Sequence, residues 1–257
     1  MCFIISWGSP VFRKSHNFCS LSILVLEYVP LTDDDLLHIH HLPSLEELNL
    51  NHTGVGDTGY ASLCRSLFFL YHLASVFYLV ALRHTLTTLK LRGNESITDN
   101  ALPALLLLSY LRMLGLRGTI ISMTGLRRLI PFSDRLFLDV PADCEAYLDS
   151  ESRISSHGSA LTTRAALHTQ YLLSPVPPLI TQPEAVSTLE RAALKRNLSA
   201  HAAYNSAIST TGSKSVLCTQ LIALLERRQG DLAVREMVWR SREPEDGLEP
   251  EKAAVGT

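Results

Sequence analysis

The 257-residue chain lacks the short motifs that are typical of the common enzyme classes. It has no HExxH, GxSxG or GxGxxG pattern, and residues 212–215 (GSKS) lack the glycine spacing that a phosphate-binding loop requires. The five cysteines are dispersed without a CxxC pair, which argues against a disulfide framework or a zinc site. The HIHH run at residues 38–41 has no carboxylate or cysteine at ligand spacing. We therefore expect no catalytic residue, no metal site and no cofactor.

Strong charge and a secretory signal are also missing. The formal net charge is −2, so any basic site for nucleic acid must be local. The first residues hold only a short apolar stretch with no basic segment before it, which is a poor signal peptide. Reduced thiols and the absence of a signal favour an intracellular protein, nuclear or cytoplasmic.

A leucine spacing of LxxLxL occurs four times. Its members are Leu21, Leu24, Leu26; Leu45, Leu48, Leu50; Leu86, Leu89, Leu91; and Leu111, Leu114, Leu116. The first two triplets start 24 residues apart and the last two 25 apart. This self-similarity indicates leucine-rich repeats, in which each repeat pairs one short strand with a helix. The predicted fold is therefore α/β, a short leucine-rich-repeat solenoid or horseshoe.

The middle interval breaks this period. Leu45 and Leu86 lie 41 residues apart, 17 more than one repeat of 24, and residues 66–82 form an uncharged apolar run of that length. Three interpretations stay open. The run is a buried helix inserted into the repeats, a membrane helix close to the minimum length of roughly 20 residues, or a short intron translated by a gene-model error.

Period-2 alternation places the leucines of each strand in the core and the residues between them on the concave face. Its charge runs from acidic in the second repeat to basic in the last, and such a mixed surface suits a protein partner better than a nucleic acid duplex. The predicted protein-binding residues are Glu47, Asn49, Asn51, Thr88, Lys90, Arg92, Met113 and Arg117.

The punctuation "T-x-ITD-x-x-L", best seen in ITDNALPAL at residues 97–105, gives the repeats a family resemblance. They resemble the cysteine-containing leucine-rich repeats of F-box proteins and of the mitotic-exit antagonist family. The resemblance covers residues 21–129, and the family's cysteine is replaced by Val29, Thr53, Asn94 and Thr119. It implies a substrate receptor of a ubiquitin ligase as an alternative function, although no LPxELLxxI F-box segment precedes the repeats.

After the repeats we expect a last strand over residues 136–140, a helix over 142–150 and a proline-rich linker up to 183. The segment at 184–226 then resembles a SAP motif, a small helical module that binds DNA. The matching residues are Leu194, Lys195, Leu198, Thr211, Gly212, Lys214, Leu217, Leu221 and Leu225. By this resemblance, phosphates would meet the start of the second helix and nearby basic side chains. The predicted nucleic-acid-binding residues are Arg191, Lys195, Arg196, Gly212, Ser213 and Lys214.

A further helix is expected from Gly230, with Leu232, Met237, Val238 and Trp239 as docking residues, before a disordered tail. The predicted organisation is an N-terminal segment (1–20), the repeats (21–140), a helix and linker (141–183), a small all-α SAP-like module (184–242) and the tail (243–257). The predicted function is a non-enzymatic adaptor that binds a protein through the repeats, with DNA as a second partner of the module. A membrane-anchored repeat protein using residues 66–82 is the other alternative, and a membrane is the less favoured partner.

Overall fold

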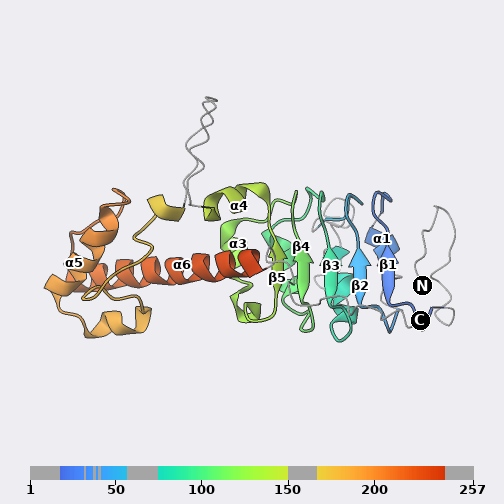
Figure 1. Ribbon diagram of the computed structural model, residues 1–257, viewed down its shortest axis with the longest axis horizontal. Coiled ribbons are helices and arrows are strands. Elements are labelled where there is room, and N and C mark those ends of the chain that lie inside the picture. The colour runs from blue at the N-terminus through green and yellow to red at the C-terminus, as the bar shows by residue number, and fades with distance from the viewer. Residues whose placement is uncertain are drawn as a thin grey trace, which may run out of the picture.

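The first half of the chain is built on a parallel sheet. The computed structural model describes residues 18–31, 33–36, 39, 42–56, 75–149 and 167–240. Five strands lie side by side in chain order, with helical segments behind them (Figure 1). They are β1 (Ile23–Val25), β2 (Glu47–Asn49), β3 (Thr88–Lys90), β4 (Met113–Gly115) and β5 (Phe137–Asp139). The fifth strand confirms the strand expected after the fourth triplet.

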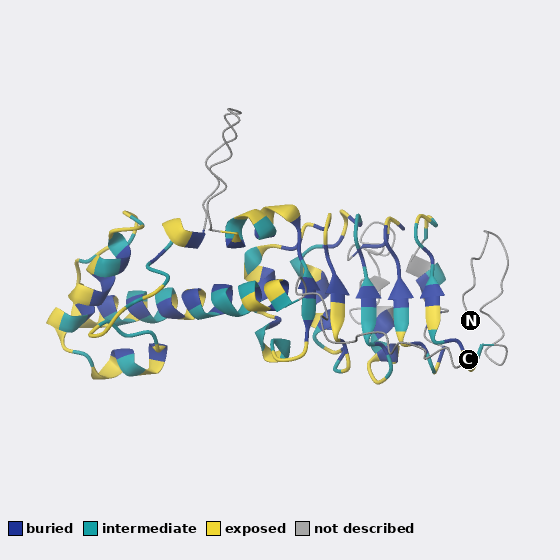
Figure 2. Cartoon of the chain, in the orientation of Figure 1, coloured by how far each residue is buried: buried dark blue, intermediate teal, exposed yellow. Residues whose placement is uncertain are grey.

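The register of the sheet stacks the central leucine of each strand on the next. Leu24, Leu48, Leu89, Leu114 and Leu138 are aligned, and all are fully buried. Burial of each leucine contributes on the order of 1.5–3 kcal/mol relative to an exposed position. Because side chains alternate between the two faces of a strand, the residues on either side of each leucine face outward (Figure 2).

Short helical segments cover the inner face of the sheet and complete the first hydrophobic cluster. They are α1 (Asp33–Leu36), η3 (Ser75–Leu82), η4 (Asp99–Ala101), α2 (Leu102–Leu105), α3 (Met123–Arg127), η5 (Ile130–Phe132) and α4 (Ala142–Leu148). Thr98 caps the N-terminus of η4, and Ser122 caps that of α3. In each case the side-chain oxygen accepts a hydrogen bond from a backbone N–H of the first turn.

Polar side chains at equivalent positions of three repeats, Thr53, Asn94 and Thr119, satisfy the turns after the strands. The Thr53 and Thr119 hydroxyls donate to the carbonyls three residues earlier, at 2.8 and 2.7 Å. Asn94 is buried, accepts from the Thr53 and Gly54 N–H groups and donates to the Leu50 and Leu91 carbonyls. These bonds tie the second repeat to the third, because buried backbone groups need partners.

The end of the apolar run at 66–82 lies in the core. Its residues from Ser75 form η3, whose Leu79 and Leu82 are buried in the first cluster. The 3-10 segment packs against α1 and α2, as the helical part of a repeat does. Residues 66–74 lie outside the described part of the chain. In the described ranges, no helix is both long and apolar enough to cross a membrane.

The C-terminal part is helical and surrounds a second hydrophobic cluster. It contains η6 (Leu167–Thr169), η7 (Pro183–Thr188), α5 (Arg191–Ala202) and α6 (Lys214–Arg240). Val186, Leu194, Leu198, Leu217, Leu221 and Leu225 form the cluster. The proline-rich segment is held by Asn197, which accepts from Ile180 N–H, and by Gln229, which bonds Thr181 and Gln182.

Helix α6 connects the two clusters and is 27 residues long, or about 40 Å at 1.5 Å per residue. Its first half contributes to the second cluster, and Val234, Met237 and Val238 belong to the first. Figure 1 shows it running from α5 to the end of the sheet. The expectation of a separate helix from Gly230 is therefore wrong, although Met237 and Val238 do pack on the repeats. Trp239 is partly exposed beneath the Arg235 guanidinium.

The helical spacing of apolar residues from 184 to 198 predicts one continuous helix, but the structure interrupts it. Segment η7 ends at Thr188, Leu189 is extended, and α5 starts at Arg191. The Ser187 and Thr188 hydroxyls donate to the carbonyls of Glu184 and Ala185. Such local bonds compete with the helical backbone, which explains why apolar spacing alone did not predict the break.

Candidate functional site

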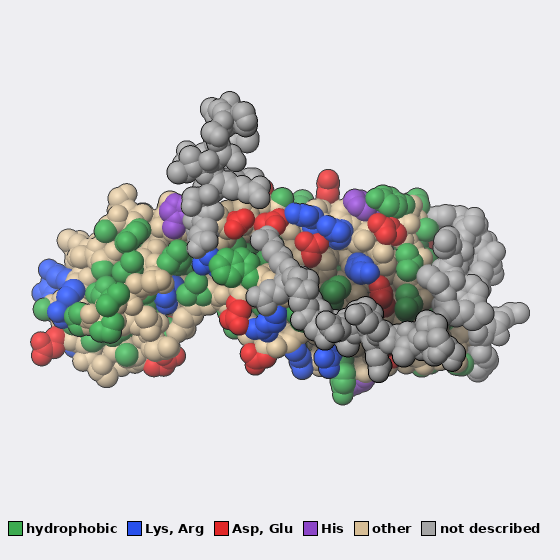
Figure 3. Space-filling view, in the orientation of Figure 1, with side chains coloured by type: hydrophobic (Ala, Val, Ile, Leu, Met, Phe, Trp, Pro, Cys, Tyr) green, Lys and Arg blue, Asp and Glu red, His purple; other side chains and the backbone are tan. Residues whose placement is uncertain are grey.

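The outer face of the sheet is the surface on which the sequence places the predicted protein-binding residues. We define it by the side chains that flank the buried leucines: Ile23, Val25, Glu47, Asn49, Thr88, Lys90, Met113, Phe137 and Asp139. The third position of β4 is Gly115, which contributes no side chain to this face. Figure 3 shows acidic, basic and hydrophobic side chains intermixed over the strands. Ile23 is 37 % exposed and Met113 45 %, so apolar surface reaches solvent in the first and fourth repeats.

The basic residues of this region are paired with carboxylates. Lys90 Nζ lies 2.7 Å from Glu47 Oε1, Arg92 Nε 3.1 Å from Asp139 Oδ2, and Arg117 Nη2 2.7 Å from Glu145 Oε2. All six side chains are partly exposed, so each pair contributes at most about 1 kcal/mol. Arg92 passes close to Gly115 on its way to Asp139. The predicted acidic-to-basic gradient is therefore largely neutralised within the protein.

Two of the eight predicted residues are buried. Asn49 donates to Glu27 Oε2 at 3.0 Å and accepts from Asn51 N–H, and Asn51 accepts from Arg92 N–H at 2.9 Å. These amides hold neighbouring repeats together, so both side chains have little exposed surface with which to contact a partner protein. Glu47, Thr88, Lys90, Arg92, Met113 and Arg117 keep surface at the outer face.

Two aromatic residues beside this face, Tyr28 and His52, are not among the predicted binding residues. Tyr28 is 69 % exposed, and its ring stacks on His52 with centroids 4.8 Å apart and planes 5° from parallel. Both follow the last strand leucine of their repeat by two positions, where the third and fourth repeats have Gly93 and Gly118. An aromatic residue at a position that other repeats give to glycine is the signal that could have identified them.

A buried carboxylate joins the repeats to α6. Asp231 accepts hydrogen bonds from Arg127 Nε at 2.7 Å, from the Tyr147 hydroxyl at 2.9 Å and from the Tyr171 hydroxyl at 2.6 Å. Its side chain is completely buried. Burial and the Asp231 charge raise the pKa of Tyr147 to about 12 and raise that of Tyr171 further, so both phenols stay protonated donors at pH 7.

Gly230, the residue before Asp231, allows α6 to pack closely against Arg127 and Ile130. A Cβ at Gly230 would lie 3.0 Å from Arg127 Cγ and 3.4 Å from Ile130 Cδ1. At its end, α6 is held by Arg240, whose Nη1 donates to the Ser133 carbonyl at 2.9 Å. A side chain at position 230 would require Arg127 or Ile130 to shift by a few tenths of an ångström.

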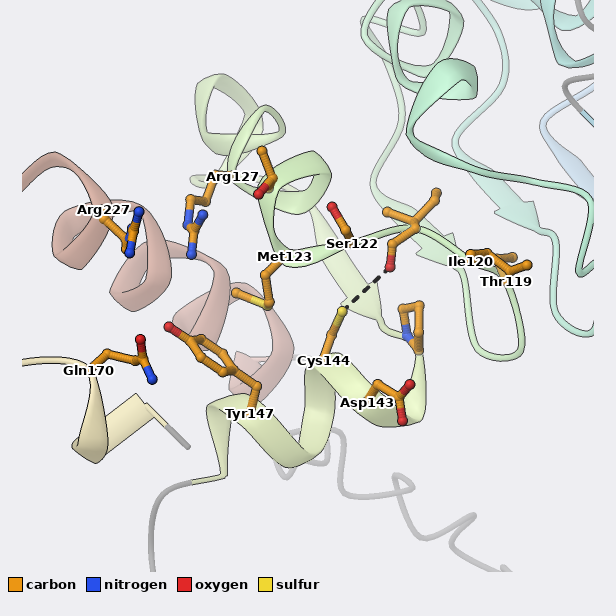
Figure 4. A pocket seen from close by; sticks show the side chains of 13 residues that line it. Thr119, Ile120, Ser122, Met123, Arg127, Asp143, Cys144, Tyr147, Gln170 and Arg227 are labelled. Atoms are coloured by element: carbon orange, nitrogen blue, oxygen red, sulfur yellow. Dashed lines mark hydrogen bonds between the residues drawn. The ribbon is translucent and has the colours of Figure 1, made fainter. Parts of the chain in front are cut away.

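A cavity of about 640 Å³ lies beside this junction, between α3, α4 and α6 (Figure 4). Met123, Cys144 and Tyr147 line its apolar part, and Arg127 and Arg227 lie close together on one side of it. Burial raises the pKa of the Cys144 thiol to about 11, and the thiol donates to the Ile121 carbonyl. A protonated thiol with no histidine among the lining residues is a weak nucleophile.

The predicted nucleic-acid-binding residues lie at the far end of the helical part. Arg191 Nη2 donates to the Gly212 carbonyl at 2.9 Å, which ties α5 to the turn before α6. Ser213 Oγ accepts from Val216 N–H and caps α6, as its sequence position predicts. Lys195, Arg196 and Lys214 are exposed and form no ion pair with other described residues.

The same region contains a buried histidine. His201 Nδ1 accepts from Leu172 N–H at 3.1 Å, and the ring is fully buried. Burial, together with the nearby Arg228 charge, lowers the pKa of His201 to about 4. The imidazole is therefore neutral at pH 7 and holds the segment after η6 on α5.

Comparison with known proteins identifies leucine-rich repeats in this chain and no other feature. A family model described as leucine-rich repeat matches residues 41–64 and 84–106, so the chain contains two such repeats. The unmatched residues between them, 65–83, exceed the predicted insertion by one residue at each end. Leucine-rich repeats generally mediate protein–protein interactions and are typically non-enzymatic scaffolds. No curated protein matches the chain, and no solved structure matches it.

Proposed function

We propose that this protein is a non-enzymatic adaptor that recognises another protein through the outer face of its sheet. The observation that carries the proposal is the exposure of Ile23 and Met113 among partly exposed charged side chains, on a sheet whose leucines are fully buried. An apolar contact surrounded by polar groups is the usual anatomy of a protein interface. The horseshoe curvature, the independent helical module and the ubiquitin-ligase alternative stay predictions.

We expect the double variant Ile23→Asp/Met113→Asp to fold and to lose its protein partners. Both side chains are at least one-third exposed, so a carboxylate there stays hydrated and costs little stability. In the interface, the same carboxylate would be desolvated without a partner. Affinity purification of the tagged full chain, followed by quantitative mass spectrometry, measures which proteins are lost relative to the wild type.

The matched control is Leu107→Asp/Tyr110→Asp. These residues are 50 % and 57 % exposed, and they lie in the connection between α2 and β4. The control should retain the partners that the outer-face variant loses. Loss of partners in the control alone would move the interface to that connection and contradict the proposal.

DNA binding by the helical part is a second candidate. It is favoured by three exposed cations, Lys195 and Arg196 on α5 and Lys214 at the start of α6, which no described carboxylate neutralises in an ion pair. Phosphates bind to such cations and to the N–H groups of a helix start, with an affinity that falls steeply as salt rises. Arg191 contributes less, because it already bonds Gly212.

We expect Lys195→Glu/Lys214→Glu in the full chain to abolish binding to duplex DNA without unfolding the protein. Gel-shift titrations at low and at physiological salt measure the affinity, and circular dichroism checks the fold. Glu226→Lys, which adds a charge farther along α6, is the control for non-specific attraction and should leave binding unchanged or slightly stronger. Equal binding by the double variant and the wild type would remove these lysines from the proposed site.

A further inference from the structure

The residue two positions after the last strand leucine has the same backbone conformation in four successive repeats. Its φ angle is +61° at Tyr28, +54° at His52, +69° at Gly93 and +75° at Gly118. The N–H groups of Tyr28, His52 and Gly93 donate to the carbonyls of Asn51, Arg92 and Arg117 in the next repeat. The hydrogen-bond ladder of the sheet therefore continues through this position and fixes the left-handed conformation.

Glycine adopts this conformation freely, whereas side chains with a Cβ rarely do. Repeats three and four have the expected glycine, and repeats one and two have aromatic rings instead. A strained residue that persists in a surrounding structure suggests a function for its side chain. The core gives no reason for these rings, because Tyr28 and His52 are both exposed.

The two rings form a rigid stack on the backbone of the third repeat. Tyr28 lies parallel to His52, and a Cβ at Gly93 would overlap the His52 ring. The glycine thus provides the surface on which His52 lies, and His52 supports Tyr28. The outcome is an ordered aromatic surface beside β1 and β2, with Tyr28 at its outer end.

The charge next to this stack is negative. Glu27 directly precedes Tyr28, and its carboxylate accepts a hydrogen bond from the neutral amide of Asn49. Within the described ranges Glu27 forms no ion pair, whereas Lys90, Arg92 and Arg117 each have a carboxylate partner. The exposed aromatic stack therefore lies beside a carboxylate whose charge is not compensated.

We propose that the Tyr28–His52 stack binds an arginine side chain of the protein partner, and this inference rests on the proposed function of the outer face. A guanidinium group is planar, stacks on aromatic rings and donates two parallel hydrogen bonds to a carboxylate. The partner's arginine lies against the outer face of Tyr28, and Glu27 accepts from it. Ile23 and Val25, on the adjacent strand, contact the neighbouring apolar residues of the partner.

The test uses twelve-residue peptides selected from a random display library on the immobilised full chain. The tightest peptide is synthesised again with each arginine replaced in turn by citrulline, which has the same shape without the charge. Affinities are measured for the wild type, Tyr28→Phe and Tyr28→Gly. The glycine variant removes the ring and gives the position the residue that repeats three and four already have, so folding is not at risk.

We expect one citrulline replacement to weaken binding about fivefold in the wild type and in Tyr28→Phe, as a cation–π contact at an exposed site does. In Tyr28→Gly the same replacement should cost clearly less than in the wild type, because the ring is absent and only the contact of the arginine charge with Glu27 is lost. A citrulline penalty that is equal in all three proteins, or absent in the wild type, overturns the arginine site.

The same peptides separate this outcome from failure of the proposed function. If they lose binding to Ile23→Asp/Met113→Asp but show no arginine coupling to Tyr28, the outer face is the interface and the stack is not its arginine site. If every selected peptide binds the outer-face variant as well as the wild type, both proposals are overturned.

Discussion

Replacing Asp231 by alanine is expected to lower the free energy of unfolding by about 3–5 kcal/mol, the usual cost of removing one partner from a buried ion pair. The carboxylate accepts from Arg127, Tyr147 and Tyr171, and these groups come from three separate segments of the chain. Without it, a largely buried guanidinium and two phenol hydroxyls lose their acceptor. The loss would fall on the contact between the repeats and α6.

The measurement is urea unfolding of the full chain, followed by circular dichroism and by the fluorescence of its two tryptophans, of which Trp239 lies near the end of α6. Glu236→Ala is the matched control on the same helix, because its exposed pair with Arg240 contributes only a few tenths of a kcal/mol. If the two clusters separate in Asp231→Ala, the transition becomes biphasic, as expected when units unfold independently. A change no larger than that of Glu236→Ala would show that Asp231 does not hold the junction.

Arg127→Ala completes a double-mutant cycle for the same contact. Once Arg127 is absent, removing Asp231 should cost less, so the two changes should be clearly non-additive. Additive effects would mean that the tyrosines, and not the ion pair, account for the stability of the junction.

The sheet could be predicted from sequence because its determinants are local and periodic. Each LxxLxL triplet specifies a short strand with one buried face, and repetition of the triplet sets the register between neighbours. The pattern therefore predicted the alignment of Leu24, Leu48, Leu89 and Leu114, and it placed Glu47, Lys90 and Met113 beside these leucines. It did not name Ile23, Val25 or Phe137.

Other features depend on contacts between distant residues, which no local pattern reveals. Asp231 and Arg127 are 104 residues apart, and an isolated Gly-Asp pair in a helical sequence usually indicates a break. Gly230 instead lies inside α6, where Arg127 packs closely against it. Burial of Asn49 and Asn51 likewise arises from hydrogen bonds across repeats, whereas alternation alone placed their side chains in solvent.

Replacing Leu89 by aspartate is expected to unfold the repeats entirely. Leu89 is fully buried in the central strand, between Leu48 and Leu114. Removing its side chain alone costs about 2–5 kcal/mol, and the buried carboxylate adds several more because it has no partner. The sum approaches or exceeds the 5–15 kcal/mol by which typical domains are stable.

Circular dichroism and limited proteolysis of the full chain measure the result, with Met113→Asp as the control on the neighbouring strand. Met113 is 45 % exposed, so its aspartate variant keeps a hydrated charge and should stay within about 1 kcal/mol of the wild type. The two residues lie on adjacent strands, but Leu89 points into the core and Met113 points outward. A difference in stability between the two variants would therefore be caused by burial. A folded Leu89→Asp protein would mean that the aligned leucines are not the core of the sheet, and the assignment of its outer face would fail with it.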